Sequence, residues 1–202
     1  MGEEIRTRIV SIGLLMYQRK LTDSSGGNIS ARDGDLIYLT PKYAGAHKRW
    51  KLELEDINVL TLDGRVLEGR GAPSREKSMH LGLYRTSPKV GAVIHAHPEY
   101  PLVFAAAQES IPPATDLAEE YGGTVDLVQA ARAGSEELAQ NVIAFVRERQ
   151  HQLDIHAIPM LLPKHGVAVA ARDLDEAFSI LEMVDTNAKC LVLGRLAYAH
   201  WK

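Results

Sequence analysis

The sequence predicts an α/β fold in a single domain that spans residues 1–202. Helix-like and strand-like segments are interleaved along the chain, which is typical of this class. The length of 202 residues suits one domain that buries a sizeable core without disulfide cross-links. No repeat, low-complexity run or linker divides the chain.

The composition is that of an ordinary globular protein, with 46% hydrophobic and 24% charged residues. The formal net charge of −3 gives no indication of a nucleic-acid or membrane partner. Cys190 is the single cysteine, so no disulfide framework is expected and a reducing compartment is favoured. No apolar run reaches the roughly 18 residues of a transmembrane helix, and the N-terminus lacks the apolar core of a signal peptide. We therefore expect a cytoplasmic protein.

Four elements are expected in the first half of the chain. They are a helix over residues 3–19, hairpins over residues 28–40 and 58–67, and a helix over residues 73–85. The first helix follows from apolar residues at three- and four-residue steps between Ile5 and Met16. The hairpins follow from turn-forming residues between strand-like runs, at Arg32–Asp35 and at Asp63-Gly64.

The second half of the chain continues this pattern, although residues 111–133 favour no particular element. We expect a strand over residues 90–98, a short helix over 101–108, a helix over 135–149, two short strands within 160–171, and a final helix from Asp173 to about Ala199. Ser135 is a suitable N-cap, and the charges of its helix follow the helix dipole. Asp173 and Glu176 have the spacing of a capping box. On the final helix, Cys190 is expected to face the core.

Two histidines stand two residues apart in the strand-like run Val90–Pro98. Because side chains alternate between faces along a strand, Val93, His95 and His97 point to the same side. A buried histidine is often only a hydrogen-bonded core residue, but two on one face form half of a metal site. His165, in the tight turn between the last two strands, completes a set of three ligands. Such a set leaves one coordination position open, as in catalytic metal sites.

Two further segments are typical of anion binding and proton transfer. In Gly26–Ser30, paired glycines let the backbone turn and point N–H groups at an anion, although they equally suit a helix C-cap and turn. Ser74-Arg75-Glu76 opens a predicted helix, and a helix N-terminus favours anions. Glu76 and His80, four residues apart, share one face of that helix. Glu76 is there either a general base or an acidic residue that only serves the helix dipole.

Other signals of chemistry are absent or weak. The sequence has no Gly-x-Ser-x-Gly elbow and no phosphate-binding P-loop. Gly69 and Gly71 lack the third glycine and the βαβ context of a dinucleotide site. Nothing near Lys164 indicates the desolvation that a Schiff-base lysine needs. The three histidines and Glu76 are therefore the main candidates for a site.

In their order along the chain, these motifs resemble the class II aldolase/adducin family. They are Gly-Gly-Asn-Ile-Ser after the first helix, Ser-x-Glu opening a helix, His-x-His on a strand and His-Gly in a late turn. The resemblance runs from about Ile5 to Ala197 and implies a three-layer α/β/α domain around a mostly antiparallel mixed sheet. It implies Glu76 as the acid/base and a homotetramer with sites at subunit interfaces. It also implies a divalent metal ion, most often zinc, on three histidines, here His95, His97 and His165.

Two segments of the family's anion site are altered in this chain. After Thr40-Pro41, sugar-phosphate members usually carry Ser or Thr and then Gly, whereas this chain has Lys42-Tyr43. The paired serines before the family glutamate are here Ser74-Arg75. Two cations can hold a phosphate or carboxylate by charge instead. The expected substrate-binding residues are Gly27, Asn28, Lys42, Ser74 and Arg75.

The tyrosine that fuculose-type aldolases carry shortly after an Ile-Pro pair has no direct counterpart, because Ile111-Pro112 leads to Asp116 and then to Tyr121. The resemblance implies a metal-dependent aldolase-type lyase that cleaves a small hydroxy-ketone or sugar phosphate through a metal-stabilised enediolate. The alternatives are a dehydratase, decarboxylase or epimerase of the same family, for instance one like methylthioribulose-1-phosphate dehydratase. A third hypothesis is a non-catalytic adducin-like module, against which the intact set of three histidines argues.

Overall fold

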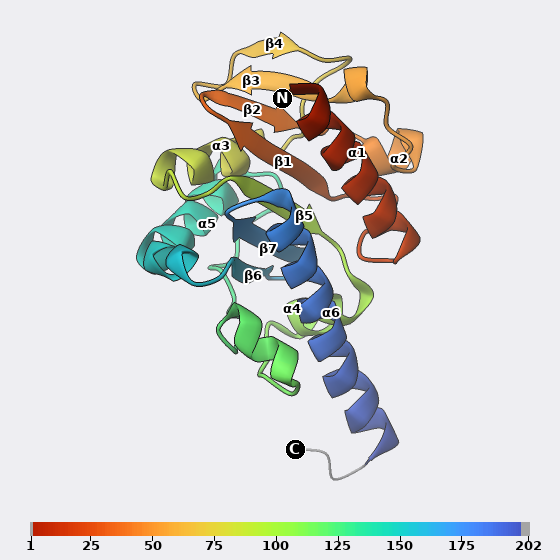
Figure 1. The fold of residues 1–202 in the computed structure, drawn as a ribbon. Coiled ribbons are helices and arrows are strands. Elements are labelled where there is room, and N and C mark those ends of the chain that lie inside the picture. Colours follow the sequence, from red (N-terminus) through yellow and green to blue (C-terminus); the bar gives the residue numbers. More distant parts are fainter. Residues whose placement is uncertain (1, 199–202) are drawn as a thin grey trace.

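The computed structural model describes residues 2–198, and its centre is one sheet of seven strands (Figure 1). The strands are β1 (Asn28–Asp33), β2 (Leu36–Leu39), β3 (Asn58–Thr61), β4 (Val66–Glu68), β5 (Ala92–Ala96), β6 (Ile158–Leu162) and β7 (Gly166–Ala171). Their order across the sheet is β4-β3-β2-β1-β5-β7-β6, and all neighbouring strands are antiparallel. A parallel contact occurs only as an isolated bridge between Leu127 and Leu161 within the described chain.

Helices cover both faces of the sheet and give the fold three layers. The helices are α1 (Gly2–Gln18), α2 (Ala44–Lys48), α3 (Lys77–Thr86), α4 (Glu99–Ala107), α5 (Glu136–Arg149) and α6 (Leu174–Ala197), with short 3-10 helices η1 (Leu54–Asp56), η2 (Asp116–Tyr121) and η3 (Gln150–Asp154). The core on one face lies under α1, α4 and α6, and the core on the other lies under α3 and α5 (Figure 1). Neighbouring β5 residues alternate between them, since Ile94 belongs to the first core and Val93 to the second.

This arrangement confirms the predicted three-layer α/β fold with a mostly antiparallel sheet. Both predicted hairpins are present, as β1–β2 and β3–β4, and the two strands around His165 are β6 and β7. Ser135 is the N-cap of α5, and its hydroxyl accepts a hydrogen bond from the backbone N–H of Leu138 (3.1 Å). Within residues 2–198, no helix has both the length and the apolar character needed to cross a membrane.

The helix predicted over residues 73–85 begins four residues late, at Lys77. Pro73 instead forms an isolated antiparallel bridge with Pro41. The Ser74 hydroxyl accepts a hydrogen bond from the backbone N–H of Glu76 (3.2 Å), which closes a turn ahead of the helix. Glu76 is therefore the N-cap of α3. The prediction was wrong here because serine and glutamate suit the first turn of a helix as well as the turn before it.

The start of α6 has one of the two contacts expected of a capping box. The Asp173 carboxylate accepts a hydrogen bond from the backbone N–H of Glu176 (2.8 Å). The Glu176 carboxylate does not return to Asp173, because it accepts from the backbone N–H (2.8 Å) and the guanidinium of Arg172. The predicted end at Ala199 lies outside the described residues, within which α6 ends at Ala197.

The buried stripe of α6 passes beside Cys190 rather than through it. Cys190 is exposed, so the prediction that it faces the core was wrong. The stripe includes the fully buried Asn187, whose side-chain oxygen accepts from the N–H of Ala114 (2.8 Å) and whose amide donates to the carbonyl of Pro112 (2.9 Å). These bonds connect the start of the segment over residues 111–133 to α6. The sequence favoured no element for this segment.

Several segments that are distant in sequence meet at one end of the sheet. In the register of β1 and β5, Asn28 lies opposite His95. The last strand, β7, pairs with the other side of β5, so the turn that precedes β7 reaches the same end of the sheet. That turn carries His165, and Glu76 at the start of α3 contacts both Asn28 and His165. This end of the sheet is the candidate site.

Candidate active site

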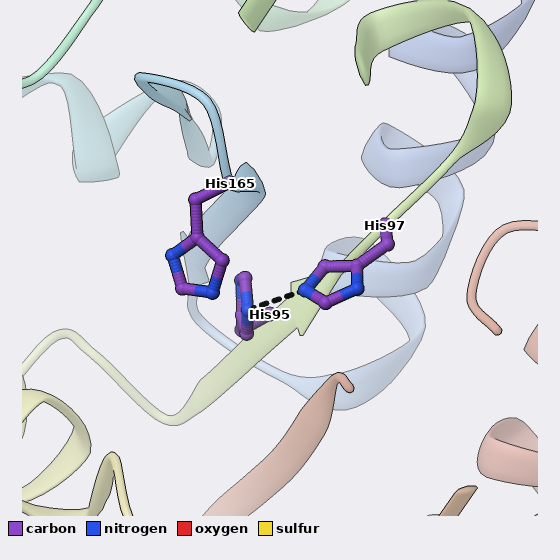
Figure 2. Close-up of side chains that lie close together, drawn as sticks. All are labelled: His95, His97 and His165. Carbon is purple, nitrogen blue, oxygen red and sulfur yellow. Dashed lines mark hydrogen bonds between the residues drawn. The ribbon is translucent and has the colours of Figure 1, made fainter. Parts of the chain in front are cut away.

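Three histidines form a compact cluster at this end of the sheet (Figure 2). His95 is in β5, His97 follows that strand, and His165 lies in the turn between β6 and β7. One side-chain nitrogen of each histidine lies within 4.8 Å of the others. The Nε2 atoms of His95 and His97 are 3.1 Å apart. The structure therefore brings together the three histidines that the sequence predicted as a set.

Neighbouring groups orient two of these imidazoles. The Nδ1–H of His95 donates to the carbonyl of Val167 (2.9 Å), so the lone pair of His95 is on Nε2 and faces the cluster. The Nδ1 of His97 lies 3.4 Å from the carboxylate of Asp23, which two backbone N–H groups of the following turn hold in place. A carboxylate or carbonyl behind a histidine is a common feature of metal sites. Nothing in the sequence analysis singled out Asp23.

Burial keeps two of the rings in the form that binds metals. Burial, followed by repulsion from His95, lowers the pKa of His97 to about 4 and holds the pKa of His165 well below its usual range. Metal binding requires the neutral imidazole. Three converging nitrogen donors with space for a further ligand fit a first-row divalent ion such as zinc. The donor set therefore fits the metal that the family implies.

Glu76 lies against the histidine cluster. Its Oε2 accepts a hydrogen bond from Nδ2 of Asn28 (2.7 Å) and is 3.5 Å from Nε2 of His95, while its Oε1 is 3.7 Å from Nε2 of His165. Burial raises the pKa of this carboxyl, but the imidazole of His95, the Asn28 hydrogen bond and His165 lower it more, so the net pKa is well below the usual range. An ionised carboxylate in this position is able to accept a proton from a substrate.

The predicted binding residues line the same cleft as the histidines and Glu76. They are Gly27, Asn28, Lys42, Ser74 and Arg75. At the mouth of the cleft, the Lys42 ammonium is 4.6 Å and the Arg75 guanidinium carbon 5.9 Å from the centre of the Tyr43 ring. Both distances are within the range of cation–π contacts. Two cations therefore gather around one exposed aromatic ring beside the buried cluster.

The paired glycines have a packing reason in addition to any role in anion binding. A side chain at Gly26 would overlap the ring of His97. Gly27 has a φ of +89°, and a Cβ there would press against Thr22 and Trp50. Glycine is therefore required for the chain to pass directly beside the histidines.

Tyr121 and Asp116, which follow the Ile-Pro pair, do not line the cleft. They belong to η2, where Tyr121 is buried in the core under α4 and α6, and burial raises the pKa of its hydroxyl. The cleft is also lined by Ala133, the last residue of the segment over residues 111–133 that the sequence left unassigned, and by the adjoining Gly134. No motif in that segment pointed to the site.

The fold and the three-histidine site with its carboxylate define a metal-dependent, aldolase-type lyase. Residues 7–192 match the Class II Aldolase and Adducin N-terminal domain, and the chain belongs to this family. An L-fuculose phosphate aldolase of Methanococcus maripaludis is 32% identical over 183 residues, which cover 91% of this chain and 93% of that protein. A 3-oxo-tetronate 4-phosphate decarboxylase of Escherichia coli is 28% identical over 200 residues, with coverages of 95% and 88%. A solved structure of L-fuculose 1-phosphate aldolase matches with a TM-score of 0.82 and 30% identity, over 96% of this chain and 88% of that chain.

Proposed function

We propose that the chain cleaves a small hydroxy-ketone phosphate by aldol chemistry and that Glu76 is its acid/base. The proposal is carried by the position of the Glu76 carboxylate, 3.5 and 3.7 Å from the nitrogens of two of the three clustered histidines. The proposed ligands of a divalent ion, zinc in our proposal, are His95, His97 and His165. When bound, such an ion stabilises negative charge that develops on the substrate's oxygen atoms.

Glu76 moves the proton in both halves of the reaction. Its ionised carboxylate accepts the proton of the substrate hydroxyl next to the carbon–carbon bond that breaks. The bond cleaves to an aldehyde and an enediolate, and the protonated Glu76 then returns the proton to the enediolate carbon. The Asn28 amide holds Oε2 of Glu76 at 2.7 Å, so Oε1 is the oxygen free to exchange this proton.

An anionic end of the substrate is proposed to bind at the mouth of the cleft. Lys42 and Arg75 supply positive charge there, and Gly27 and Asn28 line the same cleft. The Ser74 oxygen already accepts from the backbone N–H of Glu76 (3.2 Å), which leaves the hydroxyl proton to donate to an anion.

A decarboxylase that forms the same type of enediolate is the second candidate, ahead of a dehydratase or epimerase. The Escherichia coli relative bears the name of a decarboxylase. Lys42 and Arg75 suit a carboxylate as well as a phosphate.

Product analysis separates these functions. Zinc-loaded protein is incubated with a panel of hydroxy-ketone phosphates and phosphorylated 3-oxo acids. Release of an aldehyde together with dihydroxyacetone phosphate supports the aldolase. If the only reaction detected is release of carbon dioxide from a 3-oxo acid, the protein is a decarboxylase and the aldolase proposal is wrong. A zinc-loaded protein that transforms no member of the panel contradicts both.

We also propose that residues 1–202 form one domain that assembles as a homotetramer. Leu193 and Leu196, near the end of α6, are 43% and 79% exposed, and a partner subunit would cover them. Light scattering of the purified protein measures the number of subunits, and a monomeric mass would contradict the proposal. The cytoplasmic location expected from the sequence stays a prediction.

A further inference from the structure

A line of hydrogen-bonded side chains runs from Glu76 into the interior between β1 and α3. Glu76, His80 and Tyr84 are spaced at four-residue steps along α3 and its N-cap, and Asn28 and Ser30 are two apart on β1. Asn28 bonds Glu76 (2.7 Å) and also His80 Nε2. The Nδ1 of His80 is 2.6 Å from the Ser30 hydroxyl, which is 2.7 Å from the Tyr84 hydroxyl.

Only one direction of donation is consistent along this line. Because Nδ2 of Asn28 donates to the Glu76 carboxylate, its Oδ1 must accept, so Nε2 of His80 carries the hydrogen. A neutral His80 then accepts at Nδ1 from Ser30, whose single hydrogen is thereby used. Tyr84 must therefore donate to Ser30. Every hydrogen bond points toward Glu76, and bonds aligned in this way strengthen one another.

The inner members of this line are closed off from the cleft. Ser30 and His80 have no exposed surface, Tyr84 is 2% exposed, and none of the three lines the cleft. Complete burial lowers the pKa of His80 to about 3, which agrees with the neutral ring that the bonding pattern requires. These residues cannot touch a substrate, so any effect on the reaction is indirect, and Asn28 is the side chain that links His80 to the Glu76 carboxylate.

We propose that His80, supported by Ser30 and Tyr84, is a positioning residue for the Glu76 carboxylate. The Nε2–H of His80 fixes the Asn28 amide with its NH₂ group toward Glu76. Without that donor, the Asn28 amide is free to turn and present its oxygen to the carboxylate, which repels it. The proposal rests on the proposed function, in which Glu76 carries the proton.

The first test compares two replacements of His80, of which one keeps an N–H donor toward Asn28 and the other does not. His80→Leu removes both ring nitrogens, whereas His80→Gln keeps an N–H donor at about the position of Nε2. The control, Leu83→Val, changes a fully buried residue of α3 outside the line. Tyr84→Phe removes the most distant hydroxyl.

The readout isolates proton transfer from bond cleavage. NMR monitors how fast the carbon-bound hydrogen of dihydroxyacetone phosphate exchanges with deuterium from deuterium oxide. All variants are compared at equal zinc content. We expect His80→Leu to lower the maximal rate about 10- to 100-fold with little change in KM, as for a small misplacement of a catalytic group. The exchange rate of His80→Gln should be close to that of the wild type. The exchange rate of Tyr84→Phe should fall less than that of His80→Leu. A His80→Leu rate no lower than that of Leu83→Val overturns the proposal.

A second test does not depend on activity. In ¹⁵N NMR spectra, His80 should be a single neutral tautomer with the hydrogen on Nε2. In a crystal structure of His80→Leu, the Asn28 amide or the Glu76 carboxylate should be displaced. A carboxylate that keeps its place and its bond to Asn28 overturns the positioning role, even if the wild-type protein exchanges no hydrogen. A wild-type protein without exchange contradicts only the proposed function, and these two structural readouts then decide the positioning role.

Discussion

The inner wall and the rim of the cleft are built in different ways. The inner wall consists of side chains from a strand and the residues directly after it, a helix start and a turn, namely His95, His97, Glu76 and His165. These groups are largely buried, and hydrogen bonds to the backbone and to Asn28 orient His95 and Glu76. The rim consists of loop side chains around one exposed ring, namely Lys42, Tyr43 and Arg75. Under the proposed function, the inner wall performs the reaction and the rim selects the substrate.

The largest effect is expected from breaking the inner wall at a histidine. His97→Ala removes one of three nitrogen donors, so most of the bound metal should be lost. The rate should fall by about 10³-fold or more, since the ion supplies several kcal/mol of charge stabilisation. Elemental analysis and product formation measure both effects, with the exposed His151→Ala as the matched control. Equal metal content in wild type and His97→Ala would remove this histidine from the ligand set.

A smaller but still large effect is expected at Glu76. Glu76→Gln keeps the shape of the side chain and removes the group that accepts the proton, so kcat should fall by about 10²-fold or more for every substrate. The zinc content should be retained, which distinguishes this variant from His97→Ala. The exposed Glu137→Gln on α5 serves as the control in the same assay. Turnover near the wild-type level in Glu76→Gln would place proton transfer on another group.

Replacing a cation of the rim should discriminate between substrates. Arg75→Ala should raise KM for a phosphorylated substrate by about ten- to a hundredfold, because charge-assisted hydrogen bonds contribute about 1.5–3 kcal/mol. A neutral analogue should be affected much less. Steady-state kinetics with both compounds, and with Lys51→Ala as an exposed lysine outside the cleft, measure the contrast. An equal loss for charged and neutral compounds would mean that Arg75 has a structural role and that the rim does not select.

The buried His80 behind the inner wall should make folding stability depend on pH. Burial lowers the pKa of His80 from 6.5 to about 3, so between these values the unfolded chain binds more protons than the folded one. Stability is therefore fully present above pH 6.5 and decreases as the pH falls toward 3. One such histidine changes the free energy of unfolding by at most about 1.4 kcal/mol per pH unit.

Urea unfolding between pH 7 and 4.5, with a chelator present, measures this dependence. The curve of His80→Gln should be flatter than that of the wild type, because the glutamine does not titrate. Parallel curves for the two proteins would show that His80 binds a proton as readily in the folded as in the unfolded state.

The smallest effect is expected at Tyr43 in the rim. Its φ of +65° lies in the left-handed region, which costs a residue with a side chain roughly 1–2 kcal/mol. Tyr43→Gly relieves this cost but makes the unfolded chain more flexible, so stability should change by about 1 kcal/mol or less. Thermal unfolding measures this change. A large loss of stability would show that Tyr43 supports the fold, contrary to its assignment to an exposed rim.

The inner wall was predictable from the sequence because local periodicity controls it. Two-residue spacing places His95, in β5, and His97, directly after the strand, on the same side, and a tight turn presents His165. Asp23 and the partners of His80 on β1 could not be found in this way, because their contacts depend on how distant elements pack. The late start of α3 and the exposure of Cys190 have the same origin, since tertiary contacts decide among locally equivalent choices.

The strand order also determines when the site can come into existence during synthesis. The histidine of β5 is oriented by Val167 of β7, a residue 72 positions further along the chain. A nascent chain whose β7 has not yet left the ribosome lacks both this hydrogen bond and the turn with His165. The proposed ligand set is therefore completed only when the last strand enters between β5 and β6. An ion that then joins these strands closes a long loop, and its removal should first loosen the hairpin added last.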